Sequence, residues 1–354
     1  MRVNGHKDLK PWIMEVMKKE SASKKVTASD VAKRAGVSKW TVSRAFTDGA
    51  SIAPKVRDLI RSLAAEMDYS PNLLARSLST RSSGLIAVVA DELANPNQLN
   101  TLNELTRQLQ AQGLNSLLLN VNPEYKPATA IRLANQFQVD GIIFMGTTLT
   151  QELIELAQRI NHIPLVVIMR NSRLADIPFV TTDGYAAGAE IANLFLTQGY
   201  KRIGFMAGPT SERTELRRME GFRDRLGEAG IALTTILETA HYHRLQGMRA
   251  MQRCLETMPR DLRPEALFCE SDILAIGALD ALHAANAQRK IAIVGFDDIE
   301  MAASPQYELT TFRQPVEYLV SEAIKLIVSP GSAASTALMA PGSIVLRDSH
   351  RRND

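Results

Sequence analysis

A short stretch near the N-terminus gathers two cations, an indole and three hydroxyls within seven residues. Arg44 can donate two parallel hydrogen bonds to O6 and N7 of guanine, Lys39 offers a mobile donor, and Trp40 presents an apolar edge to a thymine methyl. The hydroxyls suit phosphate oxygens and belong to Ser38, Thr41 and Ser43. This combination predicts contacts with double-stranded DNA, and the alternative is a solvated helix with an incidental tryptophan.

The flanking residues predict two short helices joined by a tight turn, over VTASDVAKRAGVSKWTVSRAF (Val26–Phe46). Thr27 can cap the first helix with Asp30 as its reciprocal partner, and Ser38 can cap the second. Gly36 suits the reversal between them, which needs a positive φ. The apolar residues expected to face inward are Val31, Ala32, Ala35, Val42, Ala45 and Phe46. This pattern is a helix-turn-helix, whose second helix enters the major groove.

A third helix is expected to complete the core of this head. Pro54 suits its first position, and its apolar residues repeat at helical spacing from Val56 to Met67. Lys55 and Arg57, at its start, are placed to reach phosphates.

The next segment, YSPNLLARSL (Tyr69–Leu78), predicts a helix that is too short to be stable by itself. Pro71 sets its boundary and Asn72 can cap it, so it is expected to fold only against a symmetry mate and a DNA minor groove. Leu78 can wedge between base steps and kink the duplex. Arg76 joins Asn72 and Leu78 as a candidate DNA contact, and the alternative is a plain linker.

Charge is distributed unevenly along the 354 residues. Residues 1–83 hold 16 basic and 8 acidic residues, whereas the remainder holds 25 and 30, which suits a head that meets a polyanion. No apolar run reaches the roughly 18 residues of a membrane helix, and the N-terminus shows no secretory signal pattern. Cys254 and Cys269 are expected to be buried thiols in a reducing compartment. These features predict a cytoplasmic protein without membrane association.

The rest of the sequence alternates short apolar runs with helical stretches, which predicts open parallel sheets with helices on both faces. The expected strands are Leu85–Val89, Ser116–Leu119, Gly141–Phe144, Leu165–Ile168, Ile203–Met206, Ala266–Cys269 and Ile291–Val294. The expected helices include Leu99–Gln112, Ala187–Gln198 and Ile273–Ala284.

Head and body together resemble the LacI/GalR family of transcription regulators. The resemblance begins with DVAKRAGVSKWTVSR and YSPNLLARSL and continues in family order along nearly the whole chain from Val26. The further motifs are IAVVADELANP (Ile86–Pro96), DGIIFMG (Asp140–Gly146), HIPLVVIMR (His162–Arg170), VTTDGYAAG (Val180–Gly188), KRIGFMAGP (Lys201–Pro209), RMEGF (Arg218–Phe222), SDILAIGAL (Ser271–Leu279), IAIVGFDDIEMA (Ile291–Ala302) and LTTFRQP (Leu309–Pro315). So many motifs in one order make the resemblance specific.

The resemblance implies an all-α helix-turn-helix head and an α/β periplasmic-binding-protein-like body of two doubly wound parallel-sheet lobes. The expected divisions are a flexible extension (1–25), a DNA-binding domain (26–70), a hinge helix and linker (71–83) and a ligand-binding and dimerisation domain (84–354). The resemblance further implies a homodimeric regulator, usually a repressor, of a near-palindromic operator. A sugar-like effector is expected between the lobes, with no cofactor and no metal.

Four residues of the body are expected at the effector site. Arg218 matches a family residue that binds ligand hydroxyls or a carboxylate, and Asp272 matches one that accepts hydrogen bonds from ligand hydroxyls. Tyr242 falls where an aromatic ring often covers the ligand. Arg170 adds positive charge.

Departures from the family pattern also bear on the ligand. Met169 replaces a usual acidic residue, Ser271 a usual Asn and Asn97 a usual Phe, while Ala53 in the head replaces a usual Ser or Thr cap. Five arginines can make the cleft positive: Arg170, Arg213, Arg217, Arg218 and Arg244. These changes favour a sugar acid or sugar phosphate over a neutral sugar.

Other classes of protein fit the sequence less well. An enzyme is disfavoured because the chain has no GxSxG elbow, Walker loop, HExxH motif or clustered metal ligands, and Asp297 and Asp298 suit a strand-end turn. A periplasmic solute-binding protein would carry an export signal and no DNA-binding head. A nonspecific architectural DNA protein would not need so large a sensor body. No leucine heptad follows Pro330, so a coiled-coil tetramer is not expected.

Overall fold

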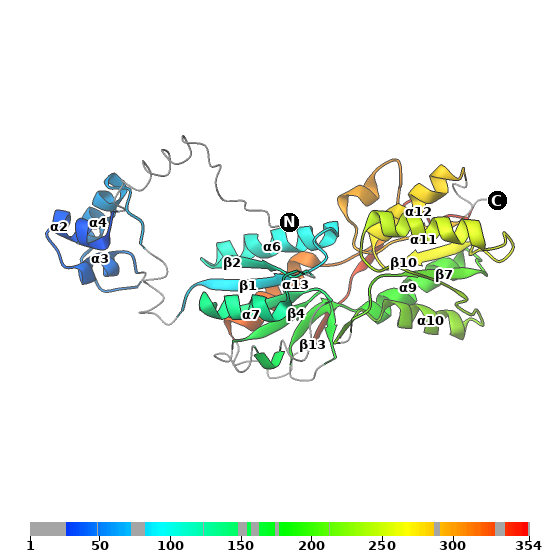
Figure 1. The fold of residues 1–354 in the computed structure, drawn as a ribbon, viewed down its shortest axis with the longest axis horizontal. Coiled ribbons are helices and arrows are strands. Elements are labelled where there is room, and N and C mark those ends of the chain that lie inside the picture. The colour runs from blue at the N-terminus through cyan, green and yellow to red at the C-terminus, as the bar shows by residue number, and fades with distance from the viewer. Residues whose placement is uncertain are drawn as a thin grey trace, which may run out of the picture. The chain divides into compact units, whose positions relative to one another are not determined.

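The computed structural model divides into two compact units, Met1–Arg81 and Ser82–Asp354 (Figure 1). The structure describes residues 26–47, 49–71, 82–122, 124–147, 154–156, 163–173, 177–211, 213–286, 291–329 and 337–352. The predicted extension 1–25 and the predicted hinge contacts Asn72, Arg76 and Leu78 lie outside these described residues.

The first unit contains the three helices that the sequence predicts, α2 (Ala28–Ala35), α3 (Lys39–Ala45) and α4 (Pro54–Glu66). The Thr27 N–H donates to Asp30 Oδ2 at 2.9 Å, and Gly36 ends α2 with a φ of 65°. Side chains from all three helices form one core, made of Val31, Ala32, Val42, Ala45, Ile60 and Ala64. The predicted helix-turn-helix and its supporting third helix are therefore confirmed.

The second unit contains two lobes, each built on a parallel sheet. The N-terminal lobe has the strands β1 (Leu85–Ala90), β2 (Asn115–Asn120), β3 (Gly141–Met145), β4 (Leu165–Ile168), β6 (Phe179–Thr182) and β13 (Ala337–Ala340). Their order is β13-β6-β4-β3-β1-β2, and every neighbouring pair is parallel. Helices α6 (Pro96–Ala111) and α13 (Val316–Val328) pack on one face, and α7 (Pro127–Gln136) packs on the other.

The C-terminal lobe repeats this design. Its strands are β7 (Ile203–Ala207), β9 (Thr235–Glu238), β10 (Ala266–Cys269) and β11 (Ala292–Val294), in the parallel order β11-β10-β7-β9. Helices α9 (Gly184–Thr197) and α10 (Arg218–Glu228) cover one face, and α11 (Arg244–Thr257) and α12 (Asp272–Ala284) cover the other (Figure 1). The predicted pair of doubly wound lobes is confirmed.

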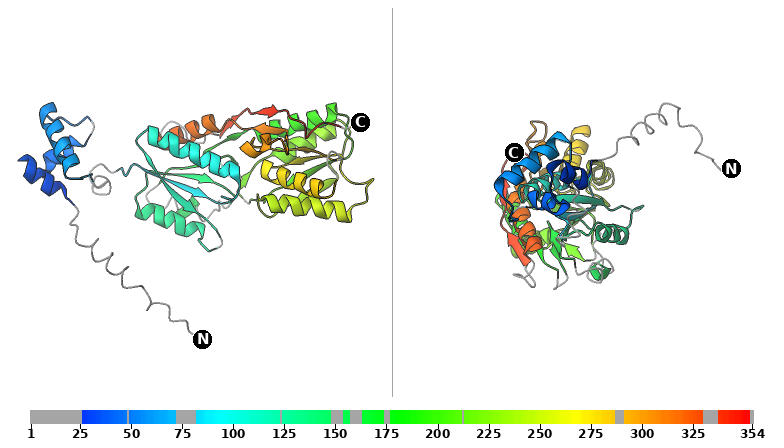
Figure 2. Two further views of the ribbon diagram at one scale, coloured as in Figure 1. Left: turned by 90° about the horizontal axis from the view of Figure 1, so that it is seen from above. Right: turned by 90° about the vertical axis from the view of Figure 1, so that its left-hand side faces the viewer.

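Within the described residues, the chain passes between the lobes after β6, after β12 (Thr311–Arg313) and before β14 (Ser343–Val345) (Figure 2). Strands β12 and β14 pair antiparallel. Two very short strands, β5 (Asn171–Ser172) and β8 (Thr214–Glu215), also pair antiparallel and tie the lobes together. These crossings place the carboxyl ends of both sheets opposite each other.

The predicted strands and helices that fall on described residues are present, whereas the predicted hinge helix lies outside the described residues. Strands β6, β9 and β13 of the two parallel sheets have no predicted counterpart. Half of β6 and half of β9 is polar, so neither segment gives a continuous apolar run. Cys254 and Cys269 are free and buried, as predicted. No helix among the described residues is long and apolar enough to cross a membrane.

Candidate recognition helix and interlobe cavity

Helix α3 presents the predicted base-contacting side chains outward. Trp40 is 67% exposed, and the guanidinium carbon of Arg44 lies 4.2 Å from the centroid of the Trp40 ring. Val42 and Ala45, on the opposite side of the helix, are buried in the core. The core fixes the helix, so the indole and the guanidinium face solvent in a fixed arrangement. This arrangement suits contact with the edge of a DNA base.

Two of the three hydroxyls fix the start of α3. Ser38 Oγ accepts a hydrogen bond from the Thr41 N–H at 3.1 Å, and the two hydroxyl oxygens lie 2.9 Å apart. The predicted Ser38 cap is therefore confirmed. Ser43 is exposed, and the predicted phosphate contacts of all three hydroxyls stay predictions.

The two cations at the start of α4 differ in their surroundings. Lys55 is exposed. Arg57 Nη2 donates to the Ala50 carbonyl at 2.7 Å and so fastens the loop that precedes α4. Both stay candidates for phosphate contact, because the Arg57 guanidinium has further N–H donors besides the one that binds Ala50.

A cavity of about 40 Å³ lies between the lobes of the second unit, beyond the carboxyl ends of their strands. Ligands of open α/β sheets bind at this end of the strands. The residues that line the cavity are Asn95, Asn97, Gln98, Gly146, Met169, Arg170, Leu216, Arg218, Tyr242, Ser271, Asp297 and Gln314. Three of the four predicted effector residues, Arg170, Arg218 and Tyr242, thus meet in one place.

The close approach of α9 and α10 positions Arg218, the first residue of α10. A Cβ added to Gly188 would lie 2.1 Å from the Arg218 carbonyl oxygen, and one added to Gly221 would lie 2.0 Å from the Tyr185 carbonyl oxygen. Only glycine permits this packing at both positions, so the GYAAG and RMEGF segments lie directly against each other. The packing buries Arg218 at the cavity wall.

The guanidinium of Arg218 is held by uncharged partners. Its Nη1 donates to the Glu270 carbonyl at 2.5 Å, and its Cζ lies 3.4 Å from the centroid of the Phe296 ring. Burial lowers the pKa of Arg218, and the more distant carboxyls of Asp297 and Glu270 oppose that shift. The side chain is thus rigidly oriented.

Arg170 approaches the cavity from the N-terminal lobe. The preceding residue, Met169, has a φ of 66°, so the chain turns sharply after β4. Arg170 Nε donates to Thr214 Oγ1 at 2.9 Å, which connects the end of β4 to β8 in the other lobe.

Tyr242 packs its ring against Gly208, where an added Cβ would lie 2.2 Å from Tyr242 Cε1. Its hydroxyl donates to Glu270 Oε2 at 2.9 Å, and the Gly208 N–H donates to the same oxygen at 2.7 Å. Across the lobes, the Tyr242 N–H donates to Glu92 Oε2 at 3.0 Å, and His241 Nδ1 lies 2.7 Å from Glu92 Oε1. The aromatic wall of the cavity is therefore tied to both lobes.

Asp297 is a cavity residue that the sequence prediction missed. It lies in the predicted strand-end turn, where Asp297 and Asp298 have φ values of 122° and 57°. Asn97 Nδ2 and Gln314 Nε2 donate to its Oδ1 at 3.0 and 2.7 Å. Burial raises the pKa of Asp297 well above its usual range, against the attraction of Arg218. The sequence feature that could have identified Asp297 as a cavity residue is its position just after the apolar run of β11.

Asp272, the fourth predicted effector residue, is engaged inside the protein. Its Oδ1 accepts a hydrogen bond from Thr311 Oγ1 at 2.5 Å, and its Oδ2 accepts one from the Ile299 N–H at 2.9 Å. Burial raises its pKa to about 7, and these two hydrogen bonds oppose the shift. Its neighbour Ser271 lines the cavity instead, and a contact between Asp272 and an effector stays a prediction.

Two of the five arginines expected to make the cleft positive are engaged elsewhere. Arg217 Nε lies 2.7 Å from Glu220 Oε2, and Arg244 Nε lies 2.5 Å from Asp280 Oδ2. Both are absent from the cavity lining, as is Arg213, so Arg170 and Arg218 are the two of the five that line it. Carboxylates on the same or an adjacent helix neutralise Arg217 and Arg244. The prediction that these two arginines make the cleft positive is therefore not supported.

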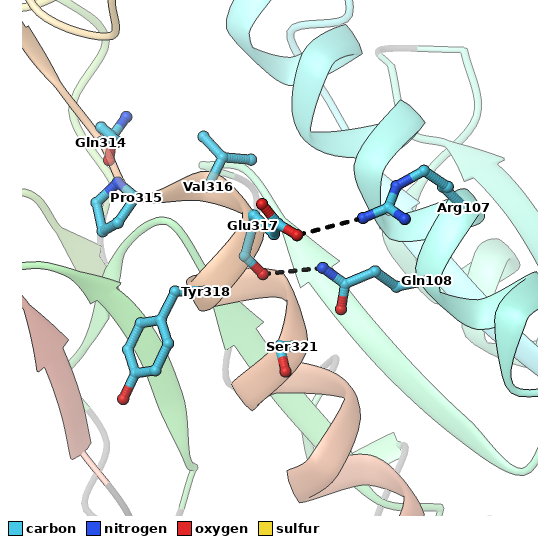
Figure 3. Close-up of a pocket in the computed structure, with 8 residues that line it drawn as sticks. All are labelled: Arg107, Gln108, Gln314, Pro315, Val316, Glu317, Tyr318 and Ser321. Atoms are coloured by element: carbon cyan, nitrogen blue, oxygen red, sulfur yellow. Dashed lines mark hydrogen bonds and ion pairs between the residues drawn. The ribbon is translucent and has the colours of Figure 1, made fainter.

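A larger hollow of about 730 Å³ lies between α6 and the start of α13 (Figure 3). Arg107 Nη2 there lies 3.6 Å from Glu317 Oε1 and 2.5 Å from Glu104 Oε1. Gln108 Nε2 donates to the Glu317 carbonyl at 2.9 Å. Because the charged and amide groups of this groove satisfy one another, the interlobe cavity is the stronger candidate for a ligand site.

Two family descriptions match the chain. "Bacterial regulatory proteins, lacI family" matches residues 27–72. "Periplasmic binding proteins and sugar binding domain of LacI family" matches residues 83–312. The matched ranges cover the helix-turn-helix and most of the two-lobed body.

Similar curated proteins are transcription regulators. The chain is 30% identical over 308 residues to the HTH-type transcriptional repressor PurR of Edwardsiella ictaluri, covering 85% of this chain and 89% of that protein. It is 30% identical to the HTH-type transcriptional regulator DegA of Bacillus subtilis, covering 84% and 89%. It is 28% identical to the Ribose operon repressor of Escherichia coli, covering 85% and 92%.

Solved structures share the fold. The lac repressor dimer bound to operator and the anti-inducer ONPF aligns with a TM-score of 0.81 at 23% identity, over 93% of this chain and 100% of that one. The complex of the transcriptional regulator CelR with cellobiose aligns with a TM-score of 0.67 at 22% identity, over 92% and 100%.

Proposed function

Because the chain belongs to the LacI family of bacterial regulatory proteins, we propose that it represses transcription from a near-palindromic operator and that a sugar-like effector between its lobes modulates this repression. The family makes it a DNA-binding transcription regulator with an effector-binding domain and not an enzyme. The observation that carries the proposal for the operator is the exposed Trp40–Arg44 pair on the capped helix α3.

Arg44 is proposed to read a guanine, with Trp40 and Lys39 beside it in the major groove. Lys55 and the hydroxyls of α3 are proposed to contact phosphates and set the register. The exposure of Trp40 supports this assignment, since its ring is open to solvent beside the Arg44 guanidinium and can reach DNA without a change in the core.

The operator is proposed to bind a homodimer, with two half-sites about one helical turn, roughly 34 Å, apart. Asn72, Arg76 and Leu78 are proposed to enter the minor groove between the half-sites, where Leu78 kinks the duplex. The description of the lac repressor as a dimer bound to operator supports this arrangement. Leu78→Ala is expected to reduce operator bending, measured by fluorescence energy transfer between the ends of a labelled duplex.

The interlobe cavity is proposed as the effector site. Its volume of about 40 Å³ is far below the roughly 300–1,000 Å³ of most ligand pockets, so the lobes must separate to admit a sugar-sized molecule. Movement of the lobes would then support or weaken the paired hinges, and the coupling free energy between the two sites must be reciprocal. Cellobiose and ribose in related solved structures support a sugar-like ligand.

The test of DNA reading is selection of binding sites from a random DNA library by the full chain. Arg44→Ala is expected to relax selection at one base position, which corresponds to about 1–3 kcal/mol. Lys55→Ala, as the matched control, is expected to weaken binding to all sequences alike and to reduce the salt dependence by about one phosphate contact. Unchanged selection by the Arg44 variant would show that α3 is not the recognition helix.

The test of the effector role is operator affinity, measured by fluorescence anisotropy with and without each member of a sugar panel. A ligand that acts through the body must change the operator Kd. If the ligand also binds the folded chain directly, a ligand concentration of about 100 times its Kd should raise the free energy of unfolding by about 2.7 kcal/mol.

A further inference from the structure

Two guanidinium groups face the interlobe cavity from opposite lobes. Arg170 is 7% exposed and Arg218 is 6% exposed, and both line the cavity. An isolated charge in such surroundings is strongly unfavourable, so buried charges in proteins are normally paired with an opposite charge.

Neither group has such a pair among the described residues. Arg170 donates to the Thr214 hydroxyl, and Arg218 donates to the Glu270 backbone carbonyl, so both acceptors are uncharged. Within the described part of the chain, no carboxylate lies within 4.0 Å of either guanidinium. Arg173, in contrast, is a more exposed arginine and lies 2.8 Å from a Glu215 carboxylate oxygen.

Two acids, Asp297 and Glu270, lie near Arg218 and act on it through space, without a direct ion pair. Asp297 is the one carboxyl group among the residues that line the cavity. Burial raises the pKa of Asp297 well above its usual range, and the charge of Arg218 opposes this shift. Glu270 Oε2 accepts hydrogen bonds from the Tyr242 hydroxyl and the Gly208 N–H, and it lies beyond ion-pair distance of both arginines.

A third group points to the same kind of ligand. Ser271 is 1% exposed and lines the cavity, and its Oγ has no hydrogen-bond partner among the described residues. Ser271 is also the N-cap residue of the 13-residue helix α12, yet its side chain makes no capping hydrogen bond. A hydroxyl donor at the positive end of a helix, close to two guanidinium groups, suits an oxyanion.

Resting on the effector site proposed above, we propose that the interlobe cavity takes a small hydroxylated molecule that carries an anionic group, a carboxylate or a phosphate. Arg170 and Arg218 bind the anion from the two lobes, and Ser271 donates a further hydrogen bond. The ligand supplies the direct charge partner that neither guanidinium has among the described residues, and it bridges the lobes through two charge-assisted contacts.

The test is a titration of the full chain with matched pairs of compounds that differ in charge. Suitable pairs are D-galacturonate with D-galactose, D-gluconate with D-glucose, and D-ribose 5-phosphate with D-ribose. For at least one pair, the charged member is expected to bind about tenfold or more tightly than the neutral member. The carboxylate and phosphate arms show which anion the site takes.

Variants assign the preference to the cavity. Arg170→Gln should abolish most of the charge preference, whereas Arg173→Gln, which changes an exposed arginine outside the cavity lining, should keep it. Without ligand, Arg170→Gln loses the hydrogen bond from Arg170 Nε to Thr214 Oγ1, so the charge preference, and not the Tm, is the diagnostic measurement. Loss of the charge preference in Arg173→Gln as well would show that the preference does not arise in the cavity and would overturn the proposal.

The two proposals fail in different ways. If neutral sugars bind as tightly as their charged partners and still change operator affinity, the anionic assignment is overturned and the effector role stands. If no member of any pair binds, the anionic assignment is overturned together with the sugar-like effector role. Preference for a charged member that persists in Arg170→Gln overturns the assignment of the anion to this cavity.

Discussion

Asn97 Nδ2 donates to Asp297 Oδ1 at 3.0 Å, and this hydrogen bond joins residues from opposite lobes at the interlobe cavity. Gln314 donates to the same oxygen at 2.7 Å from a crossing segment. A movement that separates the lobes must break the first bond, whereas the second links Asp297 to the chain segment on which the lobes turn. The Asn97–Asp297 hydrogen bond is therefore formed when the two lobes are closed and broken when they separate.

Asn97→Ala is expected to favour separation of the lobes, because Asp297 loses its partner from the N-terminal lobe. Hydrogen exchange of amides at both lips of the cavity should become faster, corresponding to about 1 kcal/mol of lost closure. Asn100→Ala, an exposed position one turn further along α6, is the control. Equal exchange in the parent chain and both variants would show that this bond does not hold the lobes together.

Asn97 and Asp297 also show where prediction from sequence ends. The caps of α2 and α3 join residues three positions apart, so side-chain type and spacing are enough to predict them. The Asn97–Asp297 bond spans 200 residues, and it depends on how two sheets face each other. The strands and lobes were predictable from apolar runs, but the polar pairs between them were not.

The arginines of the body illustrate the same limit. Arg217 and Arg218 are adjacent in sequence, yet Arg217 pairs with Glu220 while Arg218 is buried at the cavity. The direction of each side chain follows from the packing of α9 on α10, which the sequence pattern does not specify. Asp272 likewise matched a motif, but its partners Thr311 and Ile299 lie 39 and 27 residues away.

The Trp40–Arg44 pair predicts an energetic coupling in operator binding. A guanidinium over an indole contributes about 0.5–1 kcal/mol at an exposed site, and here it also orients the guanidinium. A double-mutant cycle with Trp40→Leu and Arg44→Gln, measured as operator Kd, should give a coupling energy of that size. Fully additive effects would mean that the two side chains act independently on DNA. Lys39→Gln with Arg44→Gln is the control pair.

Asp272 predicts a pH dependence of stability. Its pKa is raised from 3.8 to about 7 by burial, so between these values the folded chain holds a proton that the unfolded chain has lost. Its contribution is therefore present in full below about pH 4 and is lost as the pH rises through about 7. The slope should approach about −1.4 kcal/mol per pH unit within this window.

Asp272→Asn should remove this share of the pH dependence, measured as the free energy of unfolding by urea from pH 4 to pH 8. The amide keeps one oxygen for the Ile299 N–H or the Thr311 hydroxyl, so the variant is expected to fold. Asp261→Asn, at an exposed position, should leave the curve unchanged. If the curves of the Asp272 variant and the parent chain are parallel, Asp272 is ionised in the folded chain throughout the range.

The start of α4 predicts a stabilising substitution. Ala53 is the N-cap residue, its φ and ψ are −60° and 129°, and no side chain caps the helix. Serine at this position can accept a hydrogen bond from an N–H of the first turn, so Ala53→Ser should stabilise the first unit by about 0.5–1 kcal/mol. The free energy of unfolding by urea measures the effect, followed by tryptophan fluorescence in a Trp12→Phe background, in which Trp40 is the remaining tryptophan. Ala65→Ser, within the exposed face of α4, should be slightly destabilising, and equal effects at the two positions would show that capping is not the cause.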